Sequence, residues 1–471
     1  MRKQRQKARF LHFPESKIKT NEFCFAFPPF FRTFASAMRV LIVNTSELNG
    51  GAAVAACRLM EALNNNGVKA KMLVRDRAEV IQHDGMAVPE RITVASLPRS
   101  PWLRWHFLWE RLVIFCYLHF SRKHLFDIDL ACAGSDITRL PEFKEADVIH
   151  LHWVNQGMLS LDGIRKILQS GKPVVWTMHD VWPATAICHL TLGCRNFTTG
   201  CCHCRYLPGG GSNHDLSAVV WERKRRLLEG SNISFVACSR WLEGEARQSK
   251  LLQGQQLTSI PNPIDTRVFC PGSQAEARRQ EQLPADKRLL LFVCQSVTNR
   301  YKGMEYLVEA CRQLAAAHPE MVSNTAVVIM GGHADEVAAM LPFEAYPLGY
   351  VSDEHRIVSV FRAADAFVLP SLSENLPNTI MEAMACGVPC VGFRVGGIPE
   401  MIDHRKNGYV ARYEDADDLA QGIRWVLFEA DHDELSRQCV TKVTHSYSQS
   451  IVSLRYIEVY QHALAQRHFH L

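Results

Sequence analysis

The sequence has no long apolar run. No stretch of its 471 residues comes near the roughly 18 uninterrupted apolar residues that a membrane-spanning helix needs, so we expect no transmembrane helix. It also has no internal repeat and no low-complexity tract. The hydrophobic content of 47% and the charged content of 21% are ordinary for a soluble globular protein, and the length predicts two domains.

Beyond its first 37 residues the chain has little excess charge of either sign. Residues 1–37 carry eight Lys or Arg against two Asp or Glu, and the whole chain has a formal charge of +5, so the remainder is near −1. This balance argues against the basic face that binds nucleic acid, and we expect no nucleic-acid partner. Residues 1–37 are predicted to be a disordered or mis-started basic extension, because a buried-strand pattern begins directly after Met38.

The sixteen cysteines do not resemble the disulfide framework of a small secreted protein. Most of them sit singly in apolar runs, as Cys57, Cys294, Cys311 and Cys386 do, and are predicted to be core thiols in a reducing compartment. Five of the sixteen fall between residues 188 and 204, and that cluster is considered below.

Short apolar runs alternate with helical patterns in both halves of the chain, which is typical of parallel sheets with crossover helices. In the first half we expect strands at 40–44, 70–74, 148–153, 174–179 and 235–238 and a helix at 52–65. After an expected linker at 271–284, strands are predicted at 289–294, 326–330, 366–369 and 389–393, with helices at 301–317, 353–364 and 415–429. The predicted fold class is α/β, with two doubly wound, Rossmann-like domains that face a central cleft.

The segment 102–120 is unusually aromatic, but charged residues interrupt it, so it cannot span a bilayer. One interpretation is a pair of helical turns packed on the first domain. The alternative is a peripheral contact with a membrane surface, because Trp, Phe and Arg together suit the interface between lipid and water.

The segment 370–387 predicts a phosphate site. A strand ends at Pro370, a polar turn follows, Pro377 suits the first turn of a helix, and Gly387 closes that helix. Backbone N–H groups around Asn375 and Leu376 would then point from a helix N-terminus at the carboxyl end of a sheet, where phosphates bind.

Two carboxylates in the same segment suggest hydroxyl groups on the same ligand. Glu374 lies on the turn and could accept a hydrogen bond from a hexose, whereas Glu382 lies one to two helical turns further and could accept one from a ribose diol. Taken alone, Glu374 is as well explained as a turn residue and Glu382 as a solvated helix carboxylate.

The spacing of Glu374 and Glu382 resembles the E-x7-E signature of the family-four retaining glycosyltransferases, which have the two-domain fold called GT-B. The resemblance continues through Gly396-Gly397-Ile398-Pro399-Glu400, Asn407-Gly408 and Arg300-Tyr301-Lys302-Gly303, and it covers most of residues 38–460. It implies an acceptor-side domain at 38–265, a nucleotide-sugar-binding domain at 266–445, and a C-terminal helix at 446–471 that crosses back to the first domain.

The resemblance also implies roles for individual residues. Glu374 would contact the donor sugar, Glu382 the ribose and Lys302 the diphosphate, which a lysine suits as a point charge. Similar enzymes often have an arginine six residues before this lysine, where this chain has Ser296, and Arg300 is the residue that would compensate. No cofactor is implied for catalysis.

In the first domain, Gly50 and Gly51 open a helix, so backbone amides can approach a ligand without an intervening Cβ. A plain turn is the alternative, but their position after the first strand matches the glycine loop of the family. His179 ends an apolar strand, and the resemblance places it near the donor sugar as a substrate-binding residue rather than a general base. Asp180 would orient either His179 or the acceptor.

The cysteine cluster has the spacing of a metal site. Cys201 and Cys204 have a zinc-knuckle spacing, and Cys188 and Cys194 would complete a tetrahedral structural zinc site. Cys202 and His203 are alternatives for the fourth ligand, and a disulfide or free thiols are alternatives to a metal. The run also resembles a loop in the capsule and exopolysaccharide branch of these glycosyltransferases.

These observations predict a retaining hexosyltransferase of bacterial surface-polysaccharide assembly. Its expected partners are a nucleotide sugar and a glycan or lipid-linked acceptor, and its expected location is the cytoplasm at the inner face of the membrane. A sugar-nucleotide epimerase of the same fold and a non-catalytic sugar-nucleotide-binding scaffold are the alternatives. A phosphorylase is disfavoured because no pyridoxal-binding lysine context is present.

Overall fold

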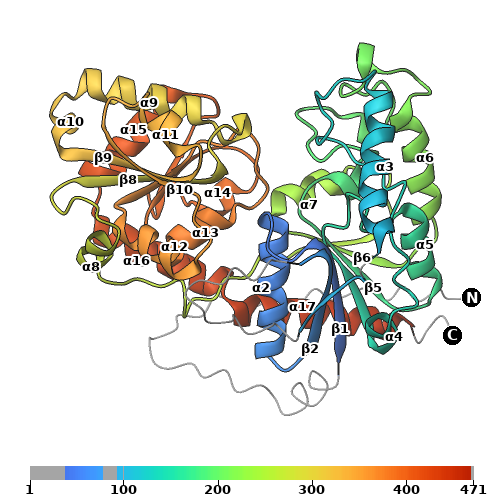
Figure 1. Ribbon diagram of the computed structural model, residues 1–471. Coiled ribbons are helices and arrows are strands. Elements are labelled where there is room, and N and C mark those ends of the chain that lie inside the picture. Colours follow the sequence, from blue (N-terminus) through green and yellow to red (C-terminus); the bar gives the residue numbers. More distant parts are fainter. Residues whose placement is uncertain (1–37, 78–92, 99, 468–471) are drawn as a thin grey trace, which may run out of the picture.

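The computed structural model describes residues 38–77, 93–98 and 100–467, so the prediction for residues 1–37 lies outside the described residues. Two domains lie side by side, each built on a sheet whose strands all pair in parallel (Figure 1). The predicted α/β fold with two doubly wound, Rossmann-like domains is confirmed.

The first sheet has the strand order β3-β2-β1-β4-β5-β6-β7 within the described residues. Its strands are β1 Arg39–Ser46, β2 Lys69–Asp76, β3 Val94–Ser96, β4 Val148–Leu151, β5 Val174–Met178, β6 Ile233–Ala237 and β7 Gln256–Ser259. The helices of this half are α2 Gly51–Asn65, α3 Pro101–Tyr117, α4 Pro141–Glu145, α5 Leu161–Gln169, α6 Leu216–Leu228 and α7 Arg240–Arg247. The central strands read as continuous apolar runs because helices cover both faces of the sheet.

The second sheet has the order β10-β9-β8-β11-β12-β13 within the same described part of the chain. Its strands are β8 Arg288–Ser296, β9 Thr325–Gly332, β10 Glu344–Gly349, β11 Ala366–Leu369, β12 Cys390–Phe393 and β13 Gly408–Ala411. The helices are α8 Gln274–Gln280, α9 Met304–Ala317, α10 Glu320–Asn324, α11 Ala334–Ala338, α12 Glu354–Ala363, α13 Asn378–Ala385, α14 Ile398–Met401, α15 Ala416–Arg424 and α16 His432–Ser446.

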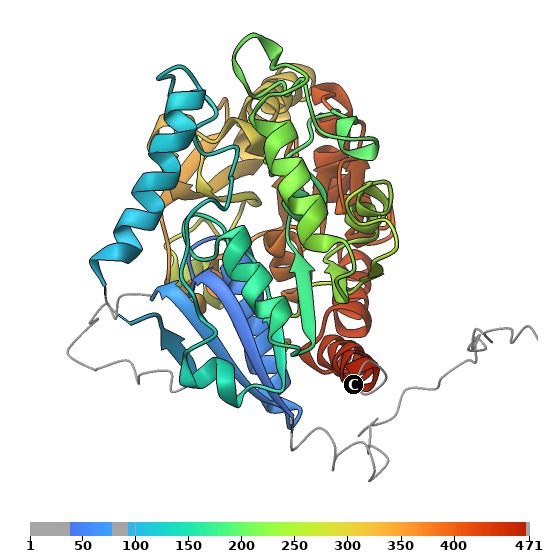
Figure 2. The same ribbon diagram turned by 90° about the vertical axis from the view of Figure 1, so that its right-hand side faces the viewer.

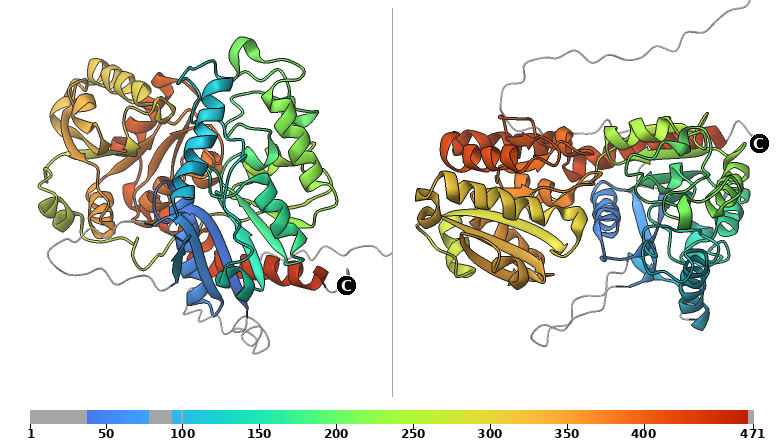
Figure 3. Two further views of the ribbon diagram at one scale, coloured as in Figure 1. Left: turned by 45° about the vertical axis from the view of Figure 1, so that its right-hand side comes forward. Right: turned by 90° about the horizontal axis from the view of Figure 1, so that it is seen from above.

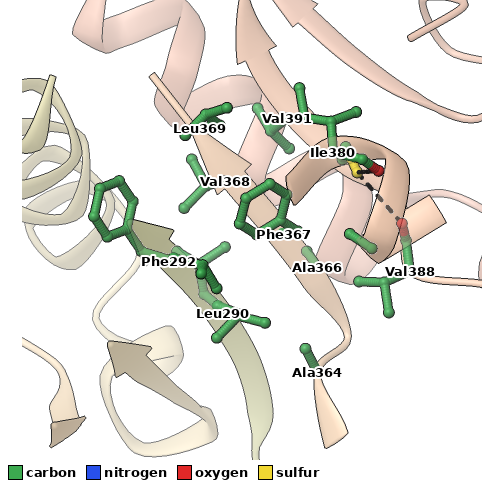
Figure 4. Packing of buried hydrophobic residues seen from close by; sticks show 14 of the residues in the cluster. Leu290, Phe292, Ala364, Ala366, Phe367, Val368, Leu369, Ile380, Val388 and Val391 are labelled. Atoms are coloured by element: carbon green, nitrogen blue, oxygen red, sulfur yellow. Dashed lines mark hydrogen bonds between the residues drawn. The ribbon is translucent and has the colours of Figure 1, made fainter. Parts of the chain in front are cut away.

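The core of the second domain lies between its sheet and its helices. Phe292 of β8, Phe367 of β11, Ile380 of α13 and Val391 of β12 all belong to this core and are fully buried (Figure 4). Cys57, Cys294, Cys311 and Cys386 are buried, as predicted. Burying such apolar side chains is the main driving force for folding.

The terminal helix α17, Gln449–Arg467, packs against the first domain. It contacts α2 and β5, and Val452, Tyr456 and Tyr460 are buried in the first domain's core. Figure 1 shows it passing beneath both domains, and in Figure 3 its far end lies under the first sheet. The chain therefore crosses from the second domain back to the first.

Three expectations from the sequence need correction. The stretch 271–284 is not only a linker, since it contains α8, which Ser273 caps through a hydrogen bond to Glu276 N. Most of the aromatic segment 102–120 lies in one continuous helix, α3, which ends at Tyr117, rather than in a pair of helical turns. The sequence pattern also did not predict β3, β7, β10 and β13, which lie at or near sheet edges where apolar runs are short. None of the described helices is long and apolar enough to cross a membrane.

In both sheets the strand order reverses beside the first strand of the domain, between β1 and β4 and between β8 and β11. Ligands bind at such topological switch points, outside the carboxyl ends of the strands. The loops that follow β1, β5, β8 and β11 hold the residues predicted for the site. The candidate site is therefore expected where these two edges meet.

Candidate active site

A cavity of about 820 Å³ lies between the two domains. The predicted site residues that line it are Gly50, Gly51, His179, Lys302, Glu374, Asn375 and Leu376. Arg300, Glu382 and the four predicted zinc ligands are absent from its described lining. The cavity is within the usual size range of a ligand pocket and takes residues from both switch points.

Lys302 and Glu374 form an ion pair on the wall of this cavity. Ser371 Oγ donates a second hydrogen bond to the same carboxylate oxygen at 3.0 Å. Burial would lower the pKa of Lys302, but the adjacent Glu374 carboxylate outweighs it and raises that pKa, so the lysine is charged. Among the described residues that line the cavity, Lys302 is the only Lys or Arg. The Lys302 cation and the Glu374 carboxylate are therefore adjacent in the cavity, where they could bind a phosphate and a hydroxyl group.

Two glycines allow the backbone to hold this pair. Gly303 has a φ of +68°, and a Cβ there would lie 1.8 Å from Pro370 O. Gly396 has a φ of +55°, and a Cβ there would lie 1.7 Å from Glu374 O. A larger residue at either position would push the turn that carries Glu374 away from Lys302.

Two helices begin at the cavity. Gly50 precedes α2 without a side-chain cap, and a Cβ on Gly50 would meet no atom within 4 Å. Pro377 precedes α13, likewise without a side-chain cap. Asn378 Nδ2 donates to Gly51 O at 3.0 Å, so the two helix starts lie side by side. Uncapped N–H groups and the positive ends of two helix dipoles favour an anion there.

Asn375 joins the two domains. Its Nδ2 donates to His179 O at 3.0 Å, and its Oδ1 accepts from Ser239 Oγ at 2.5 Å. The side chain of Leu376 is buried. Asn375 and Leu376 can therefore offer a ligand their backbone amides, because their side chains are already engaged within the protein.

Glu382 is buried and paired with Arg58 of α2 at 2.8 Å. Burial raises the pKa of Glu382 against the opposing effect of the Arg58 charge. The guanidinium also stacks over the Phe269 ring at 4.9 Å. The predicted ribose contact of Glu382 stays a prediction, and it requires the carboxylate to be shared with Arg58 or freed from it.

The ring of His179 is held on both sides. Nε2 lies 2.9 Å from His152 Nδ1, and Nδ1 lies 3.4 Å from Cys238 Sγ. Burial lowers the pKa of His179 to about 4, although Asp180 opposes the shift. The imidazole is therefore neutral at pH 7, and both of its nitrogens have protein partners.

A chain of buried polar groups continues from His179 into the sheet. The rings of His152 and His150 lie 4.2 Å apart, and His150 bonds to Thr177 at 2.7 Å and to Tyr460 of α17 at 2.8 Å. The sequence analysis missed His150 and His152. Their spacing was the available signal, because His150 lies in β4, His152 directly follows it, and residues two apart lie on one face of an extended strand.

Asp180 orients His189 rather than His179. It accepts hydrogen bonds from Trp153 Nε1 at 3.0 Å and Trp182 N at 2.8 Å, and it pairs with His189 Nδ1 at 2.7 Å. His189 Nε2 pairs with Asp129 at 2.7 Å. Burial alone would lower the pKa of His189, but the two carboxylates raise it to about 10. The first domain's wall of the cavity thus carries a positively charged imidazole, which the sequence analysis did not single out.

The four predicted zinc ligands gather in one loop as free thiols. Burial raises the pKa of Cys188 and Cys201 to about 12, and neighbouring thiols of Cys194 and Cys204 add to that of Cys188. In the described part of the chain, no group of three or more His, Cys, Asp or Glu side chains is arranged as a metal site. The predicted zinc site at these four cysteines stays a prediction.

Arg300 is not among the described residues that line the cavity. It is exposed and bonds to the Tyr301 hydroxyl at 3.1 Å, while Ser296 bonds to Thr298 at 2.8 Å. The expected compensation for Ser296 by Arg300 is therefore not seen in the lining of the cavity.

Comparisons with known proteins agree with this architecture. Residues 49–268 match the Glycosyltransferase Family 4 model, and residues 287–429 match the model described as Glycosyl transferases group 1. Among the relatives is a D-inositol 3-phosphate glycosyltransferase from Acidothermus cellulolyticus, 31% identical over 238 residues that cover 47% of this chain and 52% of the relative. Another, from Corynebacterium jeikeium, is 25% identical over 60% of this chain and 65% of the relative. The chain therefore spans between about half and two thirds of the length of these relatives.

Solved structures share the fold. A sucrose-phosphate synthase from Thermosynechococcus elongatus has a TM-score of 0.61 and 19% identity over 91% of this chain and 100% of its own. An Anabaena protein in complex with UDP-glucose has a TM-score of 0.57 and 16% identity over 90% of this chain and 99% of its own. The fold is GT-B, and both family models that match the chain describe glycosyltransferases.

Proposed function

We propose that this chain, whose two domains each match a glycosyltransferase family model, is a retaining hexosyltransferase that uses a nucleoside-diphosphate sugar. The observation that carries the proposal is the Lys302–Glu374 pair, which lies in one interdomain cavity with the uncapped N-termini of α2 and α13. A diphosphate suits Lys302 and the helix starts, and a sugar hydroxyl suits Glu374.

In this proposal the diphosphate lies between Lys302 and the backbone amides of Gly50, Gly51, Asn375 and Leu376. Lys302 stabilises the negative charge that develops on the leaving diphosphate. Glu374 binds and orients the sugar. Glu382 would reach the ribose once its carboxylate is shared with Arg58, and Arg300 remains the candidate second cation.

The state of His179 supports the proposed retention, because this residue is not available as a general base. Both of its nitrogens are bonded to protein partners, and its lowered pKa makes it a weak base at neutral pH. The acceptor's proton would instead pass to the departing phosphate on the same face of the sugar. His179 would then position the donor sugar through its contact with Asn375.

The acceptor would enter beside His189 and Asp180, on the first domain's side of the cavity. A glycan or a lipid-linked sugar of bacterial surface-polysaccharide synthesis is the proposed acceptor, and the inner face of the cytoplasmic membrane is the proposed location.

The test combines donor binding and turnover. Thermal stabilisation by UDP, GDP and ADP identifies the base, and release of that nucleotide from its sugar donors is then measured with and without lipid-linked acceptors. Acceptor-dependent release with retained anomeric configuration is expected. Donor consumption without acceptor would instead indicate an epimerase, and stabilisation without turnover would indicate a binding scaffold.

A further inference from the structure

Helix α3 carries an apolar stripe that no described part of the protein covers. Trp102, Trp105, Trp109, Leu112 and Cys116 follow one another at spacings of three and four residues, which places them on one face of the helix. Trp102 is 69% exposed, Trp105 58%, Trp109 53% and Leu112 50%. Figure 2 shows α3 on the outside of the first domain. Large aromatic side chains in such a stripe mark an interaction surface rather than scattered surface residues.

The opposite face of α3 is fixed to the domain. Glu110 is fully buried and accepts the N–H groups of Leu130 at 2.9 Å and Ala131 at 2.6 Å. Arg111 is buried against Asp129. Because these buried contacts hold the helix, its outward stripe has a set orientation.

The stripe has basic flanks. Arg104, Arg122 and Lys123 are exposed. Between residues 100 and 126, all of which are described, Glu110 is the only acid, and it is buried. The apolar surface continues past the helix through Phe120, which is 71% exposed, and Phe126, which is 61% exposed.

We propose that α3 and the turn that follows it, residues 101–126, form a docking surface for an anionic lipid bilayer. Trp side chains prefer the boundary between lipid and water, and basic residues beside them are attracted to anionic headgroups. A second copy of the chain fits less well, because pairing two such helices in either direction brings their basic flanks together.

A chain of ion pairs connects the docking surface to the cavity. Arg111 of α3 pairs with Asp129, which pairs with His189 on the acceptor-side wall of the cavity. Bilayer docking itself does not depend on the proposed function. Combined with that function, it favours a lipid-linked acceptor whose sugar reaches the cavity from the membrane surface.

The test is co-sedimentation of the full chain with vesicles of phosphatidylcholine alone or with added phosphatidylglycerol. The Trp102→Ser, Trp105→Ser, Trp109→Ser triple variant should bind the anionic vesicles at least about tenfold more weakly. A matched control replaces three exposed apolar residues elsewhere, Val219→Ser, Val322→Ser and Met340→Ser, and should bind as the unaltered chain does.

A second variant pair tests the charges. Arg122→Ala and Lys123→Ala should each weaken binding to anionic vesicles about fivefold, and added salt should reduce the difference. Residues 1–37, with their net charge of +6, are present in every variant and cannot cause these differences.

Equal vesicle binding by the triple variant and the unaltered chain would overturn the proposal. A dimer that the triple variant converts to a monomer, without any change in vesicle binding, would also overturn it in favour of a second copy. Thermal stabilisation by UDP, GDP and ADP is measured on the same samples and should be unchanged. If none of the three nucleotides stabilises the unaltered chain, that result would count against the proposed function. It would not contradict the docking surface.

Discussion

The Lys302–Glu374 pair provides the most direct test at the scale of single residues. Lys302→Ala removes the only Lys or Arg found in the described cavity lining and leaves the Glu374 carboxylate facing a diphosphate. Loss of one such stabilising group lowers kcat by about 10²- to 10³-fold in comparable sites. We expect that loss for Lys302→Ala and a similar one for Glu374→Gln, measured as initial rates of sugar transfer.

Lys287→Ala is the matched control, because Lys287 forms an ion pair with Glu344 away from the cavity. It should leave the transfer rate unchanged. If both cavity variants transfer sugar as fast as the control, the assignment of Lys302 and Glu374 to catalysis is wrong.

Glu382 and Arg58 form an almost buried pair, with side chains 11% and 10% exposed. Glu382→Gln leaves the buried Arg58 charge with only the more distant Glu354, at 3.9 Å, and breaking such a buried pair costs about 3 kcal/mol of unfolding free energy. Urea unfolding without added nucleotide measures this loss. Arg58→Met combined with Glu382→Leu removes both charges and should cost less than Glu382→Gln alone. The opposite order would show that the pair is not a coupled buried ion pair.

At the scale of elements, strand β4 places His150 and His152 in the core beneath His179. Burial lowers the pKa of His150 to about 3, below the ordinary value of 6.5. The unfolded chain therefore binds a proton at His150 between about pH 3 and 6.5 that the folded chain does not. Its contribution to stability is complete above pH 6.5 and is lost as the pH falls through this window.

His150→Gln should accordingly flatten the acid side of the stability profile by about 1.4 kcal/mol per pH unit. Urea unfolding at several pH values between 4.5 and 7 measures the slope. His119→Gln, a change at an exposed histidine, is the control and should keep the original slope. An unchanged slope in His150→Gln would contradict the burial of a neutral imidazole.

The cysteine loop provides a test of the zinc site that the cysteine spacing predicts. The spacing of Cys201 and Cys204 predicts about one equivalent of zinc in the purified protein, lost in the Cys201→Ser, Cys204→Ser variant. The structure instead holds these cysteines as free thiols with no metal-site geometry in its described part. Metal analysis by mass spectrometry decides, and an absence of zinc would establish the free-thiol alternative.

The helices and strands predicted from the sequence are those in which the spacing of apolar residues marks the buried face. The stripe of α9, Met304, Leu307, Val308, Cys311 and Leu314, is buried as its helical spacing predicts. The short strand β3 was missed because three residues give no usable period. The seven predicted residues in the cavity follow strand ends or open helices, which the sequence pattern reveals.

Long-range contacts could not be predicted in the same way. Arg58 meets Glu382 and His152 meets His179 only after the sheets have formed, and no local spacing encodes either contact. The same reason explains why Asp180 was expected to orient either His179 or the acceptor but pairs with His189.

At the scale of the whole molecule, the two domains are joined across the cavity by a carboxylate at a helix start. Glu400 of the second domain accepts the N–H groups of Arg240 at 2.9 Å and Trp241 at 2.7 Å, where α7 of the first domain begins. Ser239, the cap of α7, also bonds to Asn375. In Figure 3 the two domains meet beside α2, so these contacts hold both walls of the cavity together.

Glu400→Gln should therefore loosen the closed arrangement of the domains, because it removes a negative charge from the positive end of a helix, an interaction worth about 1 to 2 kcal/mol. A donor that contacts both domains binds only the closed form, so its apparent affinity falls with the closed fraction, by about tenfold for about 1.4 kcal/mol. Small-angle scattering should give a larger radius of gyration for Glu400→Gln, and saturating nucleotide sugar should restore the original value. Glu434→Gln, in α16 of the second domain and paired with Arg437, is the control and should change neither quantity. If Glu400→Gln weakens donor binding without any change in the radius of gyration, Glu400 acts on the donor site locally rather than through domain closure.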